Sequence, residues 1–142
     1  MPNHPDKQAQ IDALLTGEPV LARLATANPK TLQPHVTPVW FLWDGASLWI
    51  SAFISTRKAK NIARNRKIAV LIEPKCPGPL QAVLLEGECE FLAAPDERVP
   101  AMSLQIYARY VGAANLTDKE RSWTTDPENR LIKLTPSRVY SW

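Results

Sequence analysis

The chain is poor in the residues that many active sites and binding loops require. Its 142 residues include only 2 His, 2 Cys and 5 Gly. Two cysteines, Cys76 and Cys89, are too few for a disulfide scaffold, and they show no metal-site spacing with His4 or His35. The scattered glycines form no glycine-rich phosphate loop. A Ser or Cys nucleophile would need one of the two histidines as its base, so this composition disfavours a catalytic triad.

Long hydrophobic runs are missing as well. No apolar stretch approaches the ~20 residues that cross a bilayer. The first residues are polar, so we expect neither a membrane partner nor a signal peptide. With so few cysteines, this favours a reduced, cytoplasmic protein. A length of 142 residues with 45% hydrophobic content predicts a single domain over residues 1–142 with its own core.

Acidic residues are absent from one long stretch, between Gly45 and Ile72. Six of the 17 Lys and Arg residues lie between Arg57 and Lys67, which leaves the rest of the chain more acidic than basic. Such a local positive charge suits a small anionic ligand better than a long polyanion. The sequence therefore disfavours a nucleic-acid partner.

The basic stretch from Ser55 to Lys67 reads as a short helix with an unusual start. Arg57, Lys58 and Lys60 put cations into its first turn, where each opposes the helix dipole by roughly 0.3 to 1 kcal/mol. A bound anion, most simply a phosphate, would reverse that cost. The alternative is a solvated helix whose apolar residues face the core.

Residue patterns elsewhere predict a mainly β chain with short helices (α+β), in which adjacent antiparallel strands form a barrel. Asp44-Gly45 is a strong hairpin signal. The region from Gly112 to Asn129 gives no clear pattern. We expect helices at about 6–16 and 95–110, and strands at about 20–28, 33–43, 48–52, 68–73, 83–91, 131–134 and 138–142.

The strand at 83–91 and the tryptophans of the hairpin offer weaker candidates. Three glutamates at positions 86, 88 and 90 share one strand face, where solvation is more probable than catalysis, and Cys89 falls on the apolar face. Trp40, Trp43 and Trp49 surround the hairpin. Aromatic surface beside a phosphate site suits a flat heteroaromatic ligand, and the alternatives are core packing or a dimer contact.

The order and spacing of several segments resemble the pyridoxamine 5'-phosphate oxidase-like split β-barrel flavoproteins. The resemblance covers nearly the whole chain and implies an antiparallel split β-barrel of the FMN-binding type. It also implies a homodimer that binds two FMN molecules at the subunit interface. The matching segments are Leu24-Ala25-Thr26, Pro34 to Phe41, Asp44-Gly45, Leu48 to Ser51, Ser55 to Ile62, Ile68 to Ile72, Glu86-Gly87 and Arg138 to Trp142.

The resemblance also implies which residues bind the cofactor. The flavin phosphate would be held by Thr56, Arg57 and Lys58, with Lys60 and Asn61 close by. The main chain of the second strand would lie along the isoalloxazine ring, at Val36, Thr37, Pro38, Val39 and Trp40. Ser51 matches a position near the cofactor, while Trp142 and Gln81 would reach the flavin of the partner subunit.

The function implied by this resemblance is an FMN-dependent oxidoreductase. Hydride would pass through the flavin between a small-molecule substrate and reduced nicotinamide or another electron donor. One alternative is a deazaflavin-dependent reductase of the same fold, whose coenzyme has an acidic tail suited to Lys60 and Arg64. A second alternative is a non-enzymatic flavin- or haem-binding protein.

Overall fold

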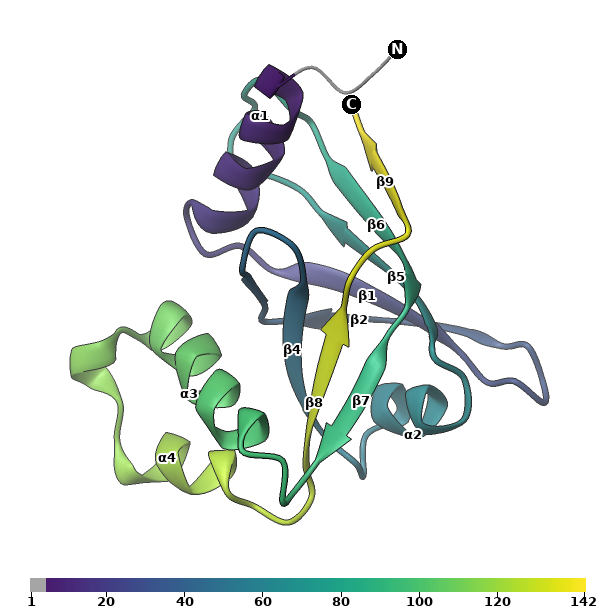
Figure 1. Cartoon of the computed structure of the whole chain (residues 1–142), viewed down its shortest axis with the longest axis vertical. Helices are drawn as coiled ribbons and strands as arrows, with labels where there is room; N and C mark the ends of the chain where they lie inside the picture. Colours follow the sequence, from purple (N-terminus) through teal and green to yellow (C-terminus); the bar gives the residue numbers. More distant parts are fainter. Residues whose placement is uncertain (1–4) are drawn as a thin grey trace.

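Two antiparallel sheets form the centre of the molecule, and the computed structural model describes residues 5–142 (Figure 1). The strands are β1 (Ala22–Ala27), β2 (Pro34–Val39), β3 (Leu42–Trp43), β4 (Leu48–Phe53), β5 (Lys67–Ile72), β6 (Val83–Glu88), β7 (Glu90–Ala93), β8 (Asn129–Leu134) and β9 (Arg138–Ser141). One sheet has the order β2-β1-β5-β6-β9, and the other has the order β3-β4-β8-β7. The two sheets are not closed into a barrel. This α+β arrangement fits the predicted split barrel.

Two predicted strands are each divided, because the chain passes from one sheet to the other within them. The run predicted at 83–91 becomes β6 and β7, with Cys89 between them. The Cys89 side chain is buried, and its backbone N donates to Arg66 O at 2.9 Å, which extends the β5–β6 pairing by one residue before the chain enters β7. The run predicted at 33–43 likewise divides into β2 and β3, with Trp40 and Phe41 between them. Periodicity alone does not reveal a change of sheet within one run of strand-like residues.

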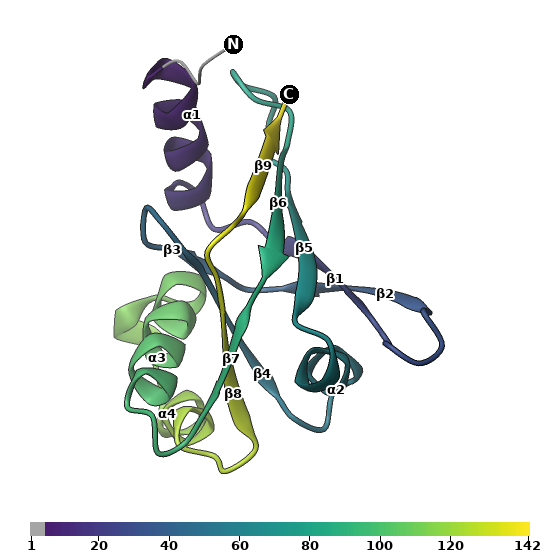
Figure 2. The ribbon, with the colours of Figure 1, turned by 45° about the vertical axis from the view of Figure 1, so that its right-hand side comes forward.

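In the described part of the chain, four α-helices pack around the sheets, namely α1 (Pro5–Thr16), α2 (Arg57–Arg64), α3 (Arg98–Val111) and α4 (Asp118–Thr124). The predicted helices correspond to α1, α2 and α3. Figure 2 shows α3 and α4 together beside the four-stranded sheet, and α2 below β1. The prediction missed α4, although Thr117 and Glu120 form a capping box at its start.

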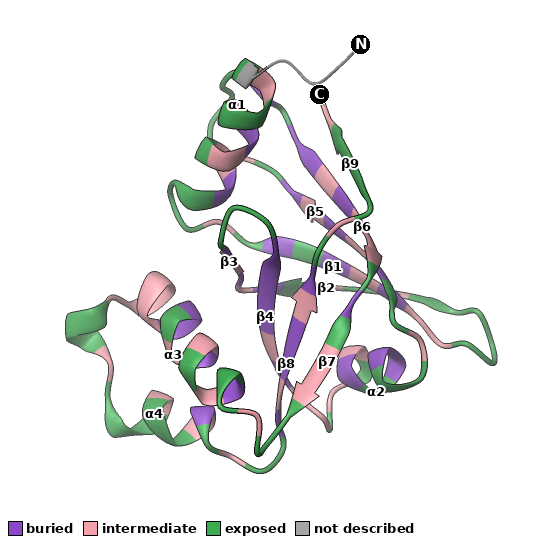
Figure 3. Ribbon diagram, in the orientation of Figure 1, coloured by how far each residue is buried: buried purple, intermediate pink, exposed green. Residues whose placement is uncertain are grey.

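The core has two parts, and Figure 3 shows the buried positions along the strands and on the inner faces of the helices. The larger part includes Leu15, Phe41, Ile50 and Ile62, so it joins α1, α2 and both sheets. The smaller part lies between α3 and the four-stranded sheet. It is formed by Trp49, Val99, Ile106, Tyr107 and Leu131.

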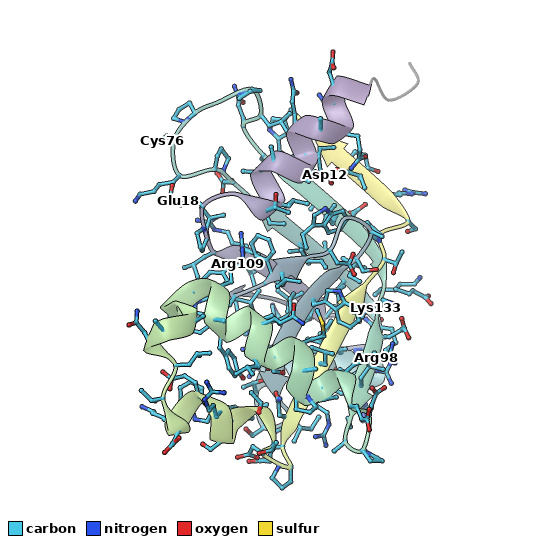
Figure 4. The ribbon with its side chains drawn as sticks, turned by 60° about the vertical axis from the view of Figure 1, so that its left-hand side comes forward. Asp12, Glu18, Cys76, Arg98, Arg109 and Lys133 are labelled. Atoms are coloured by element: carbon cyan, nitrogen blue, oxygen red, sulfur yellow. The ribbon has the colours of Figure 1, made fainter. Side chains whose placement is uncertain are left out.

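Arg109 of α3 holds the end of α1 against the link between β2 and β3 (Figure 4). Its Nη1 donates to Phe41 O at 2.9 Å and to Tyr110 Oη at 3.0 Å, and its Nη2 donates to Leu15 O at 3.2 Å and Gly17 O at 3.4 Å. Its guanidinium carbon also lies 4.7 Å from the centre of the Phe41 ring. A cation at the C-terminal end of α1 matches the helix dipole. Within residues 5–142, no helix combines the length and the apolar character that crossing a membrane requires.

Candidate functional site

Helix α2 begins with a side-chain cap and is tied to β1 by buried polar groups. Thr56 Oγ1 accepts a hydrogen bond from Ala59 N at 3.4 Å and donates one to Phe53 O at 2.7 Å. Asn61 is 6% exposed, and its Nδ2 donates to Thr26 Oγ1 at 3.0 Å. The hydroxyl of Thr56 and the amide of Asn61, both predicted to lie at the phosphate site, therefore have structural partners within the chain.

Two of the predicted cations open onto a polar hollow of about 700 Å³ beside the turn between β1 and β2. We call it the turn hollow, and it is lined by Asn28, Thr31, Gln33, Ser55, Arg57, Lys60 and Asn61. Asn28 shapes this turn, since its Oδ1 accepts from Lys30 N at 2.8 Å and from Thr31 N at 3.2 Å.

No carboxylate within residues 5–142 pairs with the cations of α2. Across this part of the chain, the side chains of Arg57, Lys58, Lys60 and Arg64 have neither an ion pair nor a hydrogen bond. The first turn of α2 also contains no acidic residue. Its positive field therefore faces the solvent and the turn hollow without compensation, as the sequence predicted.

Lys58 lies apart from Arg57 and lines a second hollow of about 370 Å³. We call it the strand hollow, and it is lined by Leu21, Pro38, Val39, Trp40, Ser51, Lys58, Ile106 and Tyr107. Burial lowers the pKa of the Lys58 ammonium from its ordinary value, because the charged form loses hydration. The structure thus brings Lys58 and Ser51 together with the second half of the predicted ring-binding strand, and it places Arg57 and Lys60 in the other hollow.

Strand β2, predicted to lie along a flavin ring, is an edge strand whose one partner among residues 5–142 is β1. Pro34 and Pro38 have no N–H to donate, which suits an edge position. Val36 is 62% exposed, while Thr37 is half-buried. Because one side of β2 has no neighbouring strand, its main chain is accessible to a ligand.

The Ser51 hydroxyl belongs to a buried polar network that sequence reasoning missed. Ser51 Oγ lies 3.1 Å from Tyr107 Oη, donates to Asn129 Oδ1 at 2.8 Å and accepts from Ser103 Oγ at 3.2 Å. Ser103 and Tyr107 are one turn apart on α3, and both are buried. The four-residue spacing of Ser103 and Tyr107 places them on one face of α3, and this could be read from the sequence. That this face contacts Ser51 on β4 is visible only in the tertiary structure.

The three hairpin tryptophans have different roles. Trp43 Nε1 donates to Asp12 Oδ1 at 2.9 Å, and the Trp43 ring is buried. Trp49 is also buried, so both residues are core residues. Trp40 lines the strand hollow and stacks on Tyr110, with ring centres 4.9 Å apart and planes 6° apart. The alternative of core packing therefore holds for two of the three tryptophans.

Gln81 and Trp142 are not brought near α2 within one chain. They are neighbours, since Gln81 N donates to Trp142 O. Strand β5 begins at Lys67, shortly after α2 ends. The other end of β5, at Ile72, pairs with Val83, which is the first residue of β6 and lies two residues after Gln81. Five residues of extended strand separate the two ends of β5 by roughly 17 Å.

Among residues 5–142, the remaining candidates include no group of three or more His, Cys, Asp or Glu side chains that could hold a metal ion. His35 is half-buried on β2, and His4 lies outside the described residues. Glu88 and Glu90 are exposed, as predicted for solvated carboxylates, while Glu86 is half-buried. Cys89 is buried and Cys76 is exposed, and both are free thiols. Burial raises the pKa of the Cys89 thiol to about 11, so it stays protonated and unreactive at neutral pH.

Two antiparallel sheets with short helices fit the α+β split-barrel class of fold. The family described as pyridoxamine 5'-phosphate oxidase matches residues 8–142 of the chain. The chain therefore belongs to the pyridoxamine 5'-phosphate oxidase family, as its sequence motifs predicted. None of the curated proteins is a match to it.

Solved structures share the fold at low sequence identity. A conserved hypothetical protein from Mycobacterium tuberculosis, Rv2991, is 23% identical with a TM-score of 0.75, over 94% of this chain and 82% of that one. An F420 reductase is 24% identical with a TM-score of 0.69, over 91% of this chain and 94% of that one. The haem storage protein HutZ from Vibrio cholerae is 13% identical with a TM-score of 0.71, over 93% of this chain and 92% of that one. At these identities, the similarity is one of fold.

Proposed function

We propose that this protein is an oxidoreductase that binds FMN between helix α2 and strand β2 and transfers hydride to a small-molecule substrate. The observation that carries the proposal is the set of four α2 cations with no acidic partner among residues 5–142, next to an edge strand. Family membership supports it, since the family is described as pyridoxamine 5'-phosphate oxidase.

The residues at hand fit a phosphorylated flavin. Arg57 and Lys60 line the turn hollow, and Lys58 lines the strand hollow on the other side of the first turn of α2, so a phosphate at this helix end would meet cations from both. The open side of β2 offers backbone groups to a flat ring. A bound flavin supplies the hydride chemistry itself. The protein would hold the phosphate, orient the ring and exclude water.

A homodimer belongs to the same proposal. Gln81 and Trp142 lie far from α2 in one chain, so a second copy would have to bring them to the cofactor. Both edge strands of the five-stranded sheet expose apolar side chains, with Val36 at 62%, Val139 at 44% and Tyr140 at 45% exposure. Burial of these side chains against a partner would remove their apolar surface from water. Light scattering after size-exclusion chromatography should give the mass of a dimer, and a monomer at micromolar concentration would contradict this part.

The first test is the cofactor itself. Purified protein titrated with FMN should develop a bound-flavin visible spectrum. Arg57→Ala with Lys58→Ala removes two charge-assisted contacts, so FMN should bind roughly 100-fold more weakly or worse. The matched control is Lys67→Ala with Lys75→Ala, which removes the same charge from exposed positions outside both hollows. Unchanged FMN affinity in the Arg57 and Lys58 double variant would mean that the phosphate binds elsewhere.

A deazaflavin coenzyme is the second candidate, favoured by the extra cations of α2. Lys60 and Arg64 are exposed and unpaired among the described residues, so they could hold additional negative charge beyond one phosphate. One of the similar structures is an F420 reductase. Dissociation constants for FMN and the deazaflavin decide between them, because Arg64 lines neither hollow, so Arg64→Ala should weaken only a ligand with an acidic tail. Steady-state turnover with a reduced nicotinamide or reduced deazaflavin distinguishes an enzyme from a flavin- or haem-binding protein.

A further inference from the structure

The five-stranded sheet packs one of its faces into the core and leaves the other open. Along β5, Ile68, Val70 and Ile72 are buried, whereas Ala69 and Leu71 are half-buried. Because side chains alternate between the two faces of a strand, Ala69 and Leu71 lie on the face away from the core. Among residues 5–142, no helix lies on the side of β5 and β6 that faces away from α1 (Figure 2). That side is therefore open in a single chain.

The strand pairing shows which residues form this open face. One row across the sheet, from β2 to β9, consists of Pro38, Arg23, Leu71, Leu84 and Tyr140. The neighbouring row consists of Val36, Ala25, Ala69, Glu86 and Arg138. We call these two rows the outer sheet face. Most of its residues are apolar, and the charged ones lie on β1, β6 and β9.

Large apolar side chains are exposed at both ends of the outer sheet face. Val36 on β2 is 62% exposed, and Tyr140 on β9 is 45% exposed. Trp142 continues β9 by exchanging backbone hydrogen bonds with Ala82, so it lies one row beyond Tyr140, and it is 54% exposed. Leu21, next to β1 in the wall of the strand hollow, is 49% exposed. A contact that covers one end with the other would remove these side chains from water.

A second copy of the chain can make such a contact with the same face. Two copies that meet through the same face are related by a two-fold axis, which lies between the two sheets. Packed sheets keep their strand directions within about 30° of each other, so this axis runs along the strands or across them. An axis across the strands places each strand over its own copy. An axis along β5, the middle strand, places β9 over β2 of the partner and β6 over β1 of the partner.

Charge favours the axis along β5. The Glu86 carboxylate on β6 is half-buried, and within residues 5–142 it has no ion pair. The axis along β5 places Glu86 opposite the strand that carries Arg23, whereas the other axis places each of them opposite a strand with the same charge. Arg23 pairs with Glu73 inside the chain, but this ion pair is exposed and contributes little, so Arg23 is free to turn to Glu86.

The exposed side chains favour the same axis. On β9, Trp142 lies two residues after Tyr140. At the other end of the same row, Trp40 lies two residues after Pro38. Strands β2 and β9 run in the same direction, because four antiparallel pairings separate them. An axis along β5 therefore brings Trp142 over the partner's Trp40, at the strand hollow, whereas an axis across the strands takes it to the opposite end of the sheet.

We propose that the outer sheet face packs on that of a second copy about a two-fold axis along β5, and that Trp142 of each copy covers the strand hollow of the other. This inference rests on the proposed function, in which a homodimer binds the cofactor. Within one chain, four strand spacings, roughly 19 Å, separate β2 from β9. Across the dimer, only the distance between two packed sheets, about 10 Å, separates them, and the side chains of the two faces fill that distance.

A charge in the middle of the outer sheet face tests the interface. Ala69→Glu places a carboxylate there, and because this face is open in a single chain, the variant should keep the wild-type circular dichroism spectrum. Light scattering should give the mass of a monomer at a concentration where the wild type is a dimer. The matched control is Ala101→Glu, which adds the same charge at an exposed position of α3 and should stay dimeric.

Two results would overturn the interface, namely a dimeric Ala69→Glu protein and a monomeric wild type. If Ala69→Glu does not fold, Ala25→Glu places the charge on the neighbouring strand in the same row, and the same masses decide.

Mixed dimers test the position of Trp142. Trp142→Ala should raise the dissociation constants of FMN and of the cofactor-free dimer roughly 10-fold each. The double variant Arg57→Ala with Lys58→Ala keeps Trp142 but loses the α2 cations. Co-expression of the two variants with different tags gives a mixed dimer, in which one site combines intact α2 cations with the partner's intact Trp142. FMN titration of the mixed dimer should therefore show tight sites that both parent variants lack. A mixed dimer without tight sites would overturn the contribution of Trp142 across the interface.

These experiments separate the inference from the proposed function. A protein that binds FMN and remains dimeric as Ala69→Glu would overturn the interface alone. A dimer that dissociates in Ala69→Glu and takes up neither flavin nor deazaflavin would overturn the proposed function, while supporting the interface. In that case, the dimer dissociation constant of Trp142→Ala still tests Trp142, and an unchanged value would exclude it from the contact.

Discussion

Replacing Arg109 with methionine removes the guanidinium that joins α3 to α1 and keeps a side chain of similar length. Four hydrogen bonds are lost, two of them at 2.9 and 3.0 Å and two at 3.2 and 3.4 Å. The guanidinium also leaves the face of the Phe41 ring, where its carbon lies 4.7 Å from the ring centre. Because α3 carries Tyr107, this contact also bears on the strand hollow.

The expected loss follows from the geometry of these bonds. A hydrogen bond to a charged group contributes about 1.5 to 3 kcal/mol when it is well formed. Only the two shorter bonds meet that condition fully, and water can reach the carbonyls at the end of α1, which are freed by the substitution. We therefore expect the free energy of unfolding to fall by about 3 kcal/mol. For a chain of this size, that corresponds to a decrease in Tm of roughly 10 °C.

Thermal unfolding followed by circular dichroism at one fixed protein concentration measures the change. The matched control is Arg98→Met on the same helix, since Arg98 pairs only with Asp96 in an exposed ion pair. Its Tm should stay within experimental error of the wild type. If Arg109→Met lowers the Tm no more than Arg98→Met does, Arg109 does not stabilise the packing of α3 on α1.

Three further predictions concern α2 and the two thiols. Thr56→Ala removes the cap of α2 and should lower the free energy of unfolding by about 1 kcal/mol in urea titrations, and an unchanged midpoint would exclude capping. Burial raises the pKa of Cys89 from 9.0 to about 11, so between these values the unfolded chain binds fewer protons than the folded one and stability falls as pH rises. The urea midpoint should fall more over this range in the wild type than in Cys89→Ala, and parallel declines would contradict the shift. At pH 8, iodoacetamide should label Cys76 and spare Cys89, as mass spectrometry would show.

Local signals in the sequence were enough to predict most of the elements. The Asp44-Gly45 hairpin forms as expected, since Asp44 Oδ1 accepts from the backbone N of Ala46 and Ser47, and Gly45 adopts a φ of 99°. Helix α2 follows from its Thr56 cap and the apolar residues on its inner face. Each of these features depends on residues only a few positions apart, so the sequence carries the signal directly.

The uncompensated charge of α2 was also evident from the sequence, because it depends on which residue types are absent. The sequence did not show that this charge is divided between two hollows. Arg57 and Lys58 are adjacent in the chain but line different hollows, because the first turn of α2 points them in different directions against β2 and the 28–33 turn. Neighbouring residues on a helix do not share a face.

Only the tertiary structure decided the roles of Ser51 and Tyr107. Ser51 is 56 residues from Tyr107 and 78 residues from Asn129, yet their side chains form one hydrogen-bonded network. No local pattern encodes a contact over such separations, because it depends on α3 packing against β4 and β8. The sequence by itself determined the family, the strands and the basic helix. Which hydroxyl of this network donates and which accepts depends on the folded arrangement, because the groups that share the protons lie far apart in the sequence.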